Sequence, residues 1–362
     1  MTTLAVSDQL PHPVLVVGAG LLGTSIGLAL SAAGIEVLLR DSSPEHLRTA
    51  SGLGAGRAAG PQDRPGLVVV AVPPDHVGAA VAEALNTTEA IVTDVGSVKS
   101  APLAEVAASV DAEALTRYVG SHPMAGSERS GPLAASARLF EGRPWAITPH
   151  ATSSADATAA VHALAEACGA TAFDYTPDDH DRAVARTSHL PHLMAVLVAG
   201  QMARAEGTDL ALSGQGVRDV TRIAAGDPQL WRQIIGANRQ AVAGLLREVR
   251  RELDALVGAL ETDDRATLVG LLEQGNVGTA AIPGKHGGPP VPETSVFVAV
   301  PDHPGELARL FADVGESGVN IEDLRIDHDP GRPVGLVELS VATHSADRLH
   351  EELRARGWST HA

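Results

Sequence analysis

A short apolar run, VLVVGAGLLG, leads from Val14 into three glycines that have the spacing GxGxxG. An apolar run that continues directly into such glycines and then into a helix-forming stretch indicates a strand, a tight turn and a helix. Gly18 permits the turn, Gly20 allows close approach to the backbone, and Gly23 lets the helix pack against the strand. The motif therefore predicts a dinucleotide-binding turn.

Further residues are expected to contact this dinucleotide. The backbone N–H groups of Leu21 and Leu22 begin the helix, where unpaired donors favour phosphate. Asp41 ends the second apolar run, where an acid hydrogen-bonds the ribose hydroxyls of NAD and repels a 2′-phosphate. Val72 and Pro73, after the third run, are expected below the adenosine. Asp41 could instead be a helix-start acid, and the arginine and serine beside it leave NADP open.

The segment from Pro13 to about Tyr175 alternates short apolar runs with amphipathic or alanine-rich stretches. Continuous apolar runs between helical patterns are typical of parallel strands that are covered on both faces. We therefore predict a doubly wound, Rossmann-type α/β domain over residues 12–178. Its strands are expected to begin near Val14, Ile35, Leu67, Ala90, Tyr118, Trp145 and Thr171.

Residues 179–281 change to helical periodicity without strands, with apolar residues such as Val242, Leu245, Leu246 and Val249 at three- and four-residue spacing. We expect an all-α domain here. Long helices attached to a dinucleotide-binding domain commonly bury their apolar face against a second subunit, so the domain also predicts a homodimer.

The last part of the chain has a different pattern. Residues 282–294 are rich in glycine and proline without periodicity and are interpreted as a linker. Residues 295–362 alternate strand and helix patterns in the order βαββαβ, with a short last strand, which predicts a ferredoxin-like α+β domain.

Composition excludes several functions. With 27 Lys+Arg against 44 Asp+Glu and a formal net charge of −17, neither nucleic acid nor an anionic membrane is an expected partner. Cys168 is the only cysteine, which excludes an intrachain disulfide and a multi-thiolate metal site. The sequence shows no signal peptide and no apolar run long enough to span a membrane, so we expect a soluble, cytoplasmic protein.

Four stretches together resemble the prephenate/arogenate dehydrogenases of tyrosine biosynthesis, over about residues 13–274. They are GAGLLGTSIGLAL from Gly18, TDVGSVKS from Thr93, GSHPMAGSERSG from Gly120, and TSHLPH from Thr187 followed by RDVTRIAAGDPQLW from Arg218. The resemblance implies the NAD-dependent oxidative decarboxylation of prephenate to 4-hydroxyphenylpyruvate, CO2 and NADH.

The same resemblance assigns two catalytic residues. His122 would accept a hydrogen bond from the ring hydroxyl of the substrate, and Ser97 would lie between His122, that hydroxyl and the nicotinamide. A neutral imidazole is required, which suits an ordinary pKa of about 6.5. The alternatives are a turn-capping histidine and a helix-capping serine. Lys99 would either add positive potential nearby or be solvated at a helix start.

Arg222 matches the family arginine that binds the side-chain carboxylate of the substrate, for which a planar guanidinium is suited. The resemblance also implies an ionic network of Glu128, Asp219 and Arg222 near the mouth of the pocket. A surface ion pair between Arg222 and Asp219 is the alternative.

Two histidines and a tryptophan complete the predicted substrate site. His189 and His192 lie three residues apart, but no third ligand cluster accompanies them, so we do not expect a metal. By resemblance, His192 contacts or supports the substrate, His189 supports it, and Trp231 lies near it. Packing is the alternative for His189 and Trp231.

The stretch VPDHPGELARLFADVGESGVNIEDL, residues 300–324, resembles an ACT domain. Such domains pair through their sheets and often bind an amino acid, which suggests tyrosine as an effector with Gly305 and Asn320 as contacts. A dimerising domain without a ligand is equally compatible with the sequence.

Two functional questions stay open at this point. Prephenate and arogenate differ only in a keto or an amino group on the side chain, so either can be the substrate. A protein of another class, a noncatalytic amino-acid sensor that retains NAD binding, is the third possibility. The presence of Ser97, His122 and Arg222 together argues against the sensor.

Overall fold

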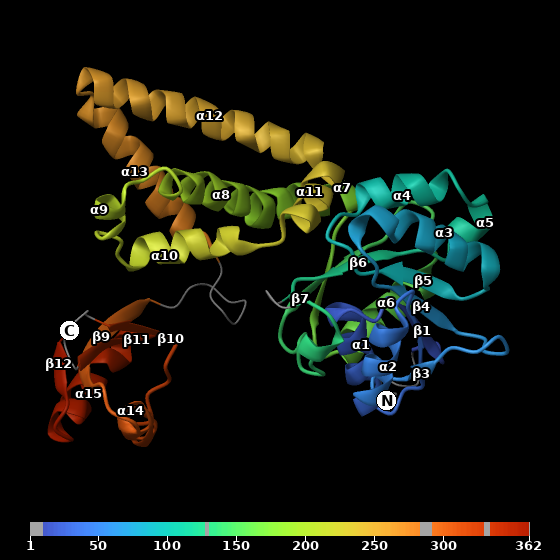
Figure 1. The fold of residues 1–362 in the computed structure, drawn as a ribbon, viewed down its shortest axis with the longest axis horizontal. Helices are drawn as coiled ribbons and strands as arrows, with labels where there is room; N and C mark the ends of the chain where they lie inside the picture. Colours follow the sequence, from blue (N-terminus) through green and yellow to red (C-terminus); the bar gives the residue numbers. More distant parts are fainter. Residues whose placement is uncertain (1–9, 127–129, 283–291, 329–333, 362) are drawn as a thin grey trace. The chain divides into compact units, whose positions relative to one another are not determined.

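The computed structural model describes residues 10–126, 130–282, 292–328 and 334–361 (Figure 1). The chain divides into two compact units, Met1–Arg250 and Arg251–Ala362, and the division falls inside a long helix. Each unit is described by itself below. Among the described residues, no helix combines the length and the apolar character that crossing a membrane requires.

The first unit contains a five-stranded parallel sheet in the order β3-β2-β1-β4-β5. The strands are β1 (Val14–Val17), β2 (Val37–Arg40), β3 (Arg57–Ala58), β4 (Leu67–Val70) and β5 (Ile91–Asp94), and the principal connecting helices are α1 (Leu21–Ala32), α2 (Pro44–Gly52) and α3 (Val77–Thr87). The strand order reverses direction between β1 and β4, and ligands of doubly wound sheets bind at such a switch point. The predicted Rossmann-type fold class is confirmed.

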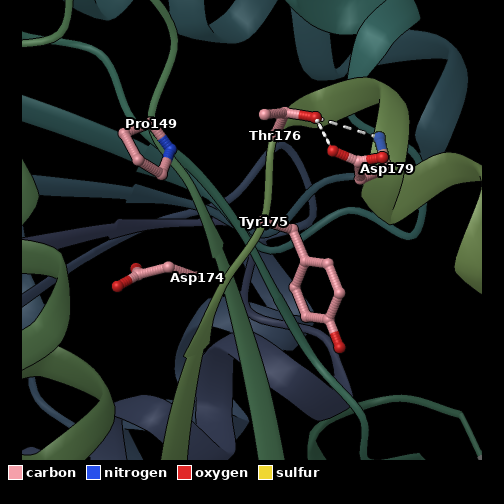
Figure 2. Close-up of a pocket in the computed structure, with 5 residues that line it drawn as sticks. All are labelled: Pro149, Asp174, Tyr175, Thr176 and Asp179. Carbon is pink, nitrogen blue, oxygen red and sulfur yellow. Dashed lines mark hydrogen bonds between the residues drawn. The ribbon is translucent and has the colours of Figure 1, made fainter.

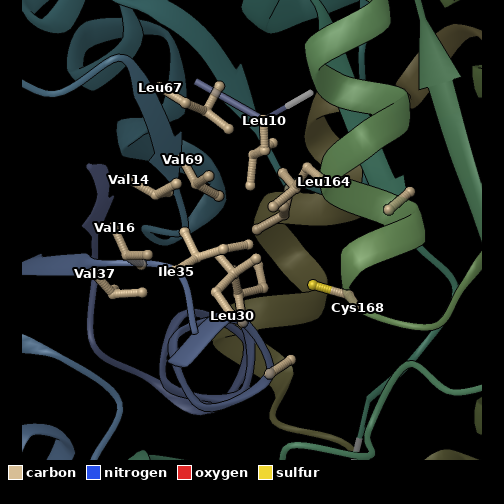
Figure 3. Close-up of a cluster of buried hydrophobic side chains, with 14 of the residues drawn as sticks. Leu10, Val14, Val16, Leu30, Ile35, Val37, Leu67, Val69, Leu164 and Cys168 are labelled. Carbon is tan, nitrogen blue, oxygen red and sulfur yellow. The ribbon is translucent and has the colours of Figure 1, made fainter. Parts of the chain in front are cut away.

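The core of this sheet explains why its strands are continuously apolar. Alternate residues of one strand enter different clusters: Val14 and Val16 pack on one face, whereas Leu15 packs on the other. Figure 3 shows the first cluster, where strand side chains meet Leu30 of α1 and Leu164 of α6 (Ala155–Ala167). Because both faces are covered by helices, polar alternation along the strands would be destabilising.

A second sheet consists of β6 (Gly120–Pro123), β7 (Pro144–Thr148) and β8 (Thr171–Asp174). A parallel bridge between Val92 and Tyr118 connects β5 to the segment that enters β6. β6 and β7 are antiparallel, which differs from the parallel arrangement that the pattern predicts. Between them the described residues form only the short turn η3 (Pro132–Ala134), so no crossover helix returns the chain to a parallel direction.

The rest of the first unit is helical. It contains α7 (Pro177–Val184), the π-helical turn η4 (Ala185–His189), α8 (Leu190–Met202), α9 (Gly207–Leu210), α10 (Gln215–Arg222), η5 (Ile223–Ala225), α11 (Pro228–Ala237) and the first part of α12 (Arg239–Thr262). Ala185, Val242 and Leu245 form its small core. The helical periodicity of this region is interrupted at Asn238, between α11 and α12, and the side chain of Asn238 donates to the backbone oxygen of Asp181.

The second unit contains α13 (Arg265–Ala280) and a C-terminal sheet. This sheet has the antiparallel order β10-β11-β9-β12. Its elements are β9 (Glu293–Pro301), α14 (Glu306–Glu316), β10 (Asp323–His328), β11 (Val334–Ala342), α15 (Thr343–Ala355) and β12 (Ser359–His361), which is the predicted βαββαβ order. The inward residues Val296, Val298 and Val300 of β9 pack against α14 and α15.

Candidate active site

The three glycines of the first turn have different structural roles. Gly18 has a φ of +103°, and a Cβ there would lie 2.3 Å from the carbonyl oxygen of Ala71. A Cβ at Gly23 would lie 1.8 Å from the carbonyl oxygen of Gly18, whereas one at Gly20 would meet nothing within 4 Å. The fold itself therefore requires Gly18 and Gly23. The open space at Gly20, at the N-terminus of α1 where Leu21 and Leu22 begin the helix, fits a phosphate.

Asp41 lies against this turn. Its Oδ2 accepts a hydrogen bond from the backbone N–H of Ala19 at 2.6 Å, and its Oδ1 accepts one from Ser43 at 2.7 Å. Ser43, and not Asp41, caps α2 by accepting from the N–H of His46 at 3.2 Å. Asp41 is partly exposed, so its oxygens retain lone pairs for the hydroxyls of a ribose. Val72 and Pro73 follow β4 at the same edge of the sheet.

His122 lies in β6 and starts a chain of buried polar groups. Its Nδ1 is 3.0 Å from Nε2 of His180, and Nδ1 of His180 is 2.9 Å from Oδ1 of Asp181. The carboxylate of Asp181 also accepts from the backbone N–H groups of Lys99 at 2.8 Å and Ser100 at 2.9 Å. Two consecutive residues of α7 thus connect β6 to the start of α4 (Ser100–Ala107).

The surroundings of His122 favour a neutral ring. Burial lowers its pKa well below the ordinary value, and the nearby His180, Lys99 and His189 lower it further. Among the described residues its Nε2 has no hydrogen-bond partner. His122 therefore presents one ring nitrogen that is available to a ligand at neutral pH.

Ser97 lies in the loop between β5 and α4, at the same edge of the sheets as His122, because the segments that carry them pair at Val92 and Tyr118. It is partly exposed and does not cap α4, since that helix begins at Ser100 with no side-chain cap of its own. The acceptor for this helix end is Asp181.

Lys99 is a buried member of the site that the sequence left undecided. It is 1% exposed and forms an ion pair with Asp94, and its Nζ donates to the carbonyl oxygen of Ser121 at 2.6 Å. Tyr118 also donates its hydroxyl to Asp94, at 2.8 Å. Burial lowers the pKa of Lys99, and Asp94 opposes that shift. The sequence offers one indication that Lys99 is unusual. The only other lysine in the sequence is Lys285, in the stretch that is rich in glycine and proline.

The aromatic residues of the predicted substrate site lie together. The ring of His192 in α8 stacks on that of Trp231 in α11, with centroids 3.5 Å apart and planes 7° apart. His189 meets Trp231 edge to face at 6.2 Å, and its Nδ1 is 3.2 Å from Nδ2 of Asn238. Burial lowers the pKa of His189 to about 4, with His180 and His192 adding to the shift and Asp181 opposing it.

The predicted ionic network is only partly visible. Arg222 ends α10 with an exposed side chain, directly before Ile223. Burial lowers the pKa of the His192 ring, and the backbone of Ile223 lies close enough to that ring to oppose the shift. Asp219 accepts from Nε2 of Gln215 at 3.0 Å. Glu128 lies outside the described residues, so its part in the network stays a prediction.

The candidate effector residues lie in the second unit. Gly305 has a φ of +98° and precedes α14, a conformation that favours glycine. The exposed Asn320 donates from Nδ2 to Oε1 of Glu322 at 2.9 Å. Their role in binding tyrosine stays a prediction.

A hollow beside the end of β8 is a separate feature of the first unit. Figure 2 shows its lining residues, Pro149, Asp174, Tyr175, Thr176 and Asp179. Thr176 and Asp179 hydrogen-bond each other as the cap of α7, and Asp174 lies 2.9 Å from His162. None of the predicted site residues lines this hollow.

The glycine turn has room for a phosphate at the N-terminus of α1, and it lies in a doubly wound parallel sheet, which is the arrangement that binds dinucleotides. The first unit therefore defines a dinucleotide-binding oxidoreductase of the α/β class. Family comparison makes this specific. Residues 26–173 match the family "Prephenate dehydrogenase, nucleotide-binding domain", and residues 176–274 match "Prephenate dehydrogenase, dimerization domain". The chain belongs to the prephenate dehydrogenase family.

Individual relatives agree with this placement. The chain is 37% identical to "Probable prephenate dehydrogenase NovF" of Streptomyces niveus, over 95% of this chain and 98% of that protein. It is similar to the structure of A. aeolicus prephenate dehydrogenase in complex with hydroxyphenyl propionate and NAD+, with a TM-score of 0.66 and 26% identity over 74% of this chain and 96% of that one. Synechocystis arogenate dehydrogenase gives a TM-score of 0.64 and 27% identity over 74% and 98%.

Proposed function

We propose that this protein catalyses the NAD-dependent oxidative decarboxylation of prephenate to 4-hydroxyphenylpyruvate, CO2 and NADH. The observation that carries the proposal is His122, in the strand β6 that adjoins the nucleotide-binding sheet: its Nδ1 is engaged by His180, and its Nε2 has no partner in the part of the chain that the structure describes. The similarity to prephenate dehydrogenases over nearly the whole chain supports the same substrate.

His122 acts on the hydroxyl of the substrate ring. Its bare Nε2 accepts a hydrogen bond from that hydroxyl and so reduces the positive charge that develops on the hydroxyl-bearing carbon as hydride departs. The electron pair of the bond to the ring carboxylate then enters the ring, CO2 leaves, and the ring becomes a phenol. NAD, when bound, supplies the hydride acceptor. The lowered pKa of His122 keeps the ring in its accepting form at neutral pH.

Cofactor and substrate are held by different elements. We assign the pyrophosphate to the turn at Gly20, the ribose to Asp41, and the nicotinamide end to Ser97. Because Ser97 is released from helix capping by Asp181, its hydroxyl is available to a ligand.

On the substrate side, Arg222 is proposed to bind the side-chain carboxylate in a bidentate manner. Its position next to Ile223, whose backbone lies near His192, brings it close to the stack of His192 and Trp231. This stack offers a flat wall to the ring of the substrate. Asp219 and Glu128 complete the proposed site near its mouth.

Arogenate is the second candidate substrate. The similarity to Synechocystis arogenate dehydrogenase, at nearly the same TM-score as the prephenate dehydrogenase, keeps this substrate as an alternative. An arogenate site gains from an acid beside the substrate ammonium. The hydrogen bond that Asp219 receives from Gln215 occupies one of its oxygens and leaves the other as a candidate acceptor.

One assay distinguishes these functions. Purified protein is given prephenate or arogenate with NAD or NADP, with and without tyrosine, and reduced nucleotide is measured. We expect NADH from prephenate with NAD. A higher kcat/KM for arogenate than for prephenate would identify arogenate as the substrate. If neither compound yields reduced nucleotide, the proposed enzymatic activity is contradicted and the noncatalytic sensor is favoured.

The remaining expectations form part of the same proposal. The C-terminal domain is proposed to be an ACT domain that binds tyrosine near Gly305 and Asn320, and the tyrosine arm of the assay tests it. The protein is proposed to be a homodimer, which the match to a dimerization domain supports. A cytoplasmic location is compatible with a single, buried cysteine.

A further inference from the structure

We propose that Asp181 and His180 are positioning residues that hold His122 in one tautomer, with hydrogen on Nδ1 and a bare lone pair on Nε2. The kinetic consequences of this inference rest on the proposed function. The tautomer itself is a property of the fold and can be measured without any substrate.

Asp181 sets the direction of the hydrogen-bond chain, because its buried carboxylate contacts three hydrogen-bonding groups. Its carboxylate receives the N–H groups of Lys99 and Ser100 and lies 2.9 Å from Nδ1 of His180. Burial alone would raise the pKa of Asp181, but the hydrogen bonds from His180, Ser100 and Lys99 outweigh it and lower the pKa. An ionised carboxylate only accepts hydrogen bonds. Nδ1 of His180 must therefore carry hydrogen.

The same direction passes to His122. An imidazole with one hydrogen on Nδ1 has a lone pair on Nε2, and Nε2 of His180 lies 3.0 Å from Nδ1 of His122. The hydrogen of this contact is therefore on His122. The remaining nitrogen of His122, Nε2, is an acceptor, which is the form that a substrate hydroxyl requires.

Reversing the hydrogen-bond direction at Asp181 would also reverse which ring nitrogen of His122 carries the hydrogen. If a side-chain N–H replaced the oxygen that faces His180, Nδ1 of His180 would become an acceptor and its Nε2 a donor. His122 would then carry hydrogen on Nε2 and could no longer accept from the substrate. A carboxylate that orients a catalytic histidine acts in this way in serine proteases.

Asp181 also has a structural role, because it caps α4 and its backbone oxygen accepts from Asn238 at 2.7 Å. A loss of activity alone would not separate the two roles. The chain offers a matched control in Asp178, which lies in the same helix and accepts from the hydroxyl of Ser100 at 2.6 Å but does not contact His180. Asp178→Asn changes the same chemistry at the same helix start.

The first experiment measures tautomers by 15N NMR of histidine-labelled protein without ligand, with His122→Asn used to assign the signals of His122. We expect hydrogen on Nδ1 of His122 in the wild type and in Asp178→Asn, and on Nε2 in Asp181→Asn. A signal of His122 that is the same in Asp181→Asn as in the wild type overturns the inference. If Asp181→Asn does not fold, His180→Leu replaces it: His122 should then show the mixture typical of a free imidazole, and a fixed Nδ1 hydrogen overturns the inference.

The second experiment is a double-mutant cycle on turnover. Asp181→Asn and His180→Leu should each lower kcat by roughly 10²- to 10⁴-fold, the range for lost acid–base positioning, with KM for prephenate and the Kd of NAD nearly unchanged. The double variant should be no slower than His180→Leu, because Asp181 acts through His180. Losses that multiply in the double variant would show a separate structural effect and contradict the inference.

The two experiments also separate this inference from the proposed function. If wild-type protein does not oxidise prephenate, the proposed function fails, and the NMR experiment still decides the tautomer. If the protein is active and the tautomer does not reverse in Asp181→Asn, only the positioning role fails.

Discussion

At the scale of single residues, the proposed chemistry of this site depends on the protonation of His122. The ring is neutral at pH 7 because burial lowers its pKa, with His180 and Lys99 adding to the effect. A charged ring would have no lone pair for the substrate hydroxyl. Because burial disfavours the charged form of His122, we expect both turnover and the free energy of unfolding to decrease at low pH, where the ring must be protonated.

Replacement of His122 tests the catalytic assignment. His122→Asn removes the acceptor for the ring hydroxyl but leaves the glycine turn and Asp41 intact, so we expect turnover to fall by about 10²- to 10⁴-fold with NAD affinity retained. Steady-state kinetics with prephenate and calorimetric titration with NAD measure the two effects. Unchanged turnover would show that His122 is not the catalytic acceptor.

Replacement of Arg222 tests the proposed carboxylate site. Arg222→Ala removes a charge-assisted hydrogen-bond donor from the end of α10, so KM for prephenate should rise by about 10- to 100-fold, which corresponds to roughly 1.5–3 kcal/mol. Arg204→Ala, an exposed arginine after α8, is the control. The assignment is wrong if both variants keep the wild-type KM.

The buried His189 predicts how stability changes with pH. Its pKa is about 4 in the folded protein and about 6.5 when unfolded, so between these values the unfolded chain binds more protons. Stability should therefore decrease as pH falls from 7 towards 4, and the decrease should be smaller in His189→Asn. Urea midpoints at pH 7 and pH 5 measure this, with the exposed His76→Asn as control. Equal pH dependence in His189→Asn and wild type would contradict the prediction.

At the scale of elements, the turn between β1 and α1 combines a structural and a functional demand. Gly18 and Gly23 are fixed by neighbouring backbone atoms, whereas Gly20 faces open space. One motif therefore contains two glycines that the fold needs and a third, Gly20, that the fold does not need and that we propose is needed for the ligand.

Two alanine variants separate these demands. Gly23→Ala would place a Cβ 1.8 Å from the carbonyl of Gly18, so it should destabilise the fold by at least ~1–3 kcal/mol, the usual range for overpacking. Gly20→Ala should keep the wild-type Tm and weaken NAD binding. Thermal unfolding without ligand and NAD titration measure the two effects. A lower Tm for Gly20→Ala, or a wild-type Tm for Gly23→Ala, would contradict this division.

The sequence predicts helices and strands best where their pattern is local. Each expected strand of the α/β domain has a counterpart. For the strands of the five-stranded sheet that enter both core clusters, the reason is that strands buried on both faces must be apolar throughout. The antiparallel pairing of β6 and β7 and the break at Asn238 could not be predicted. Both depend on partners that are distant in sequence, such as the carbonyl of Asp181, which holds the side chain of Asn238.

At the scale of the whole molecule, exposed apolar side chains indicate a partner surface. Leu197 in α8 is 58% exposed and Leu212 is 88% exposed, and both lie in the region that matches a dimerization domain. Large apolar side chains that gather on a surface commonly mark an interface.

Light scattering should therefore give a mass of twice 37.1 kDa, about 74 kDa, for the purified protein. Leu197→Asp and Leu212→Asp should shift the mass towards the monomer, because a charge would be buried without a partner. Leu133→Asp, which is 84% exposed but lies in the nucleotide-binding region, is the control and should keep the wild-type mass. A monomeric wild type would contradict the proposed homodimer.

The sequence by itself determined the α/β class, the glycine turn and the βαββαβ order, because these depend on local periodicity and on motifs of fixed spacing. His122 was identified through a family resemblance, and its catalytic role stays a prediction. Only the tertiary structure brings His180 next to His122, and Asp181 next to the start of α4. Asp181 and Lys99 are 82 residues apart, so no local sequence pattern predicts their contact. The same holds for Lys99, which is buried between Asp94 of β5 and the backbone of Ser121 in β6.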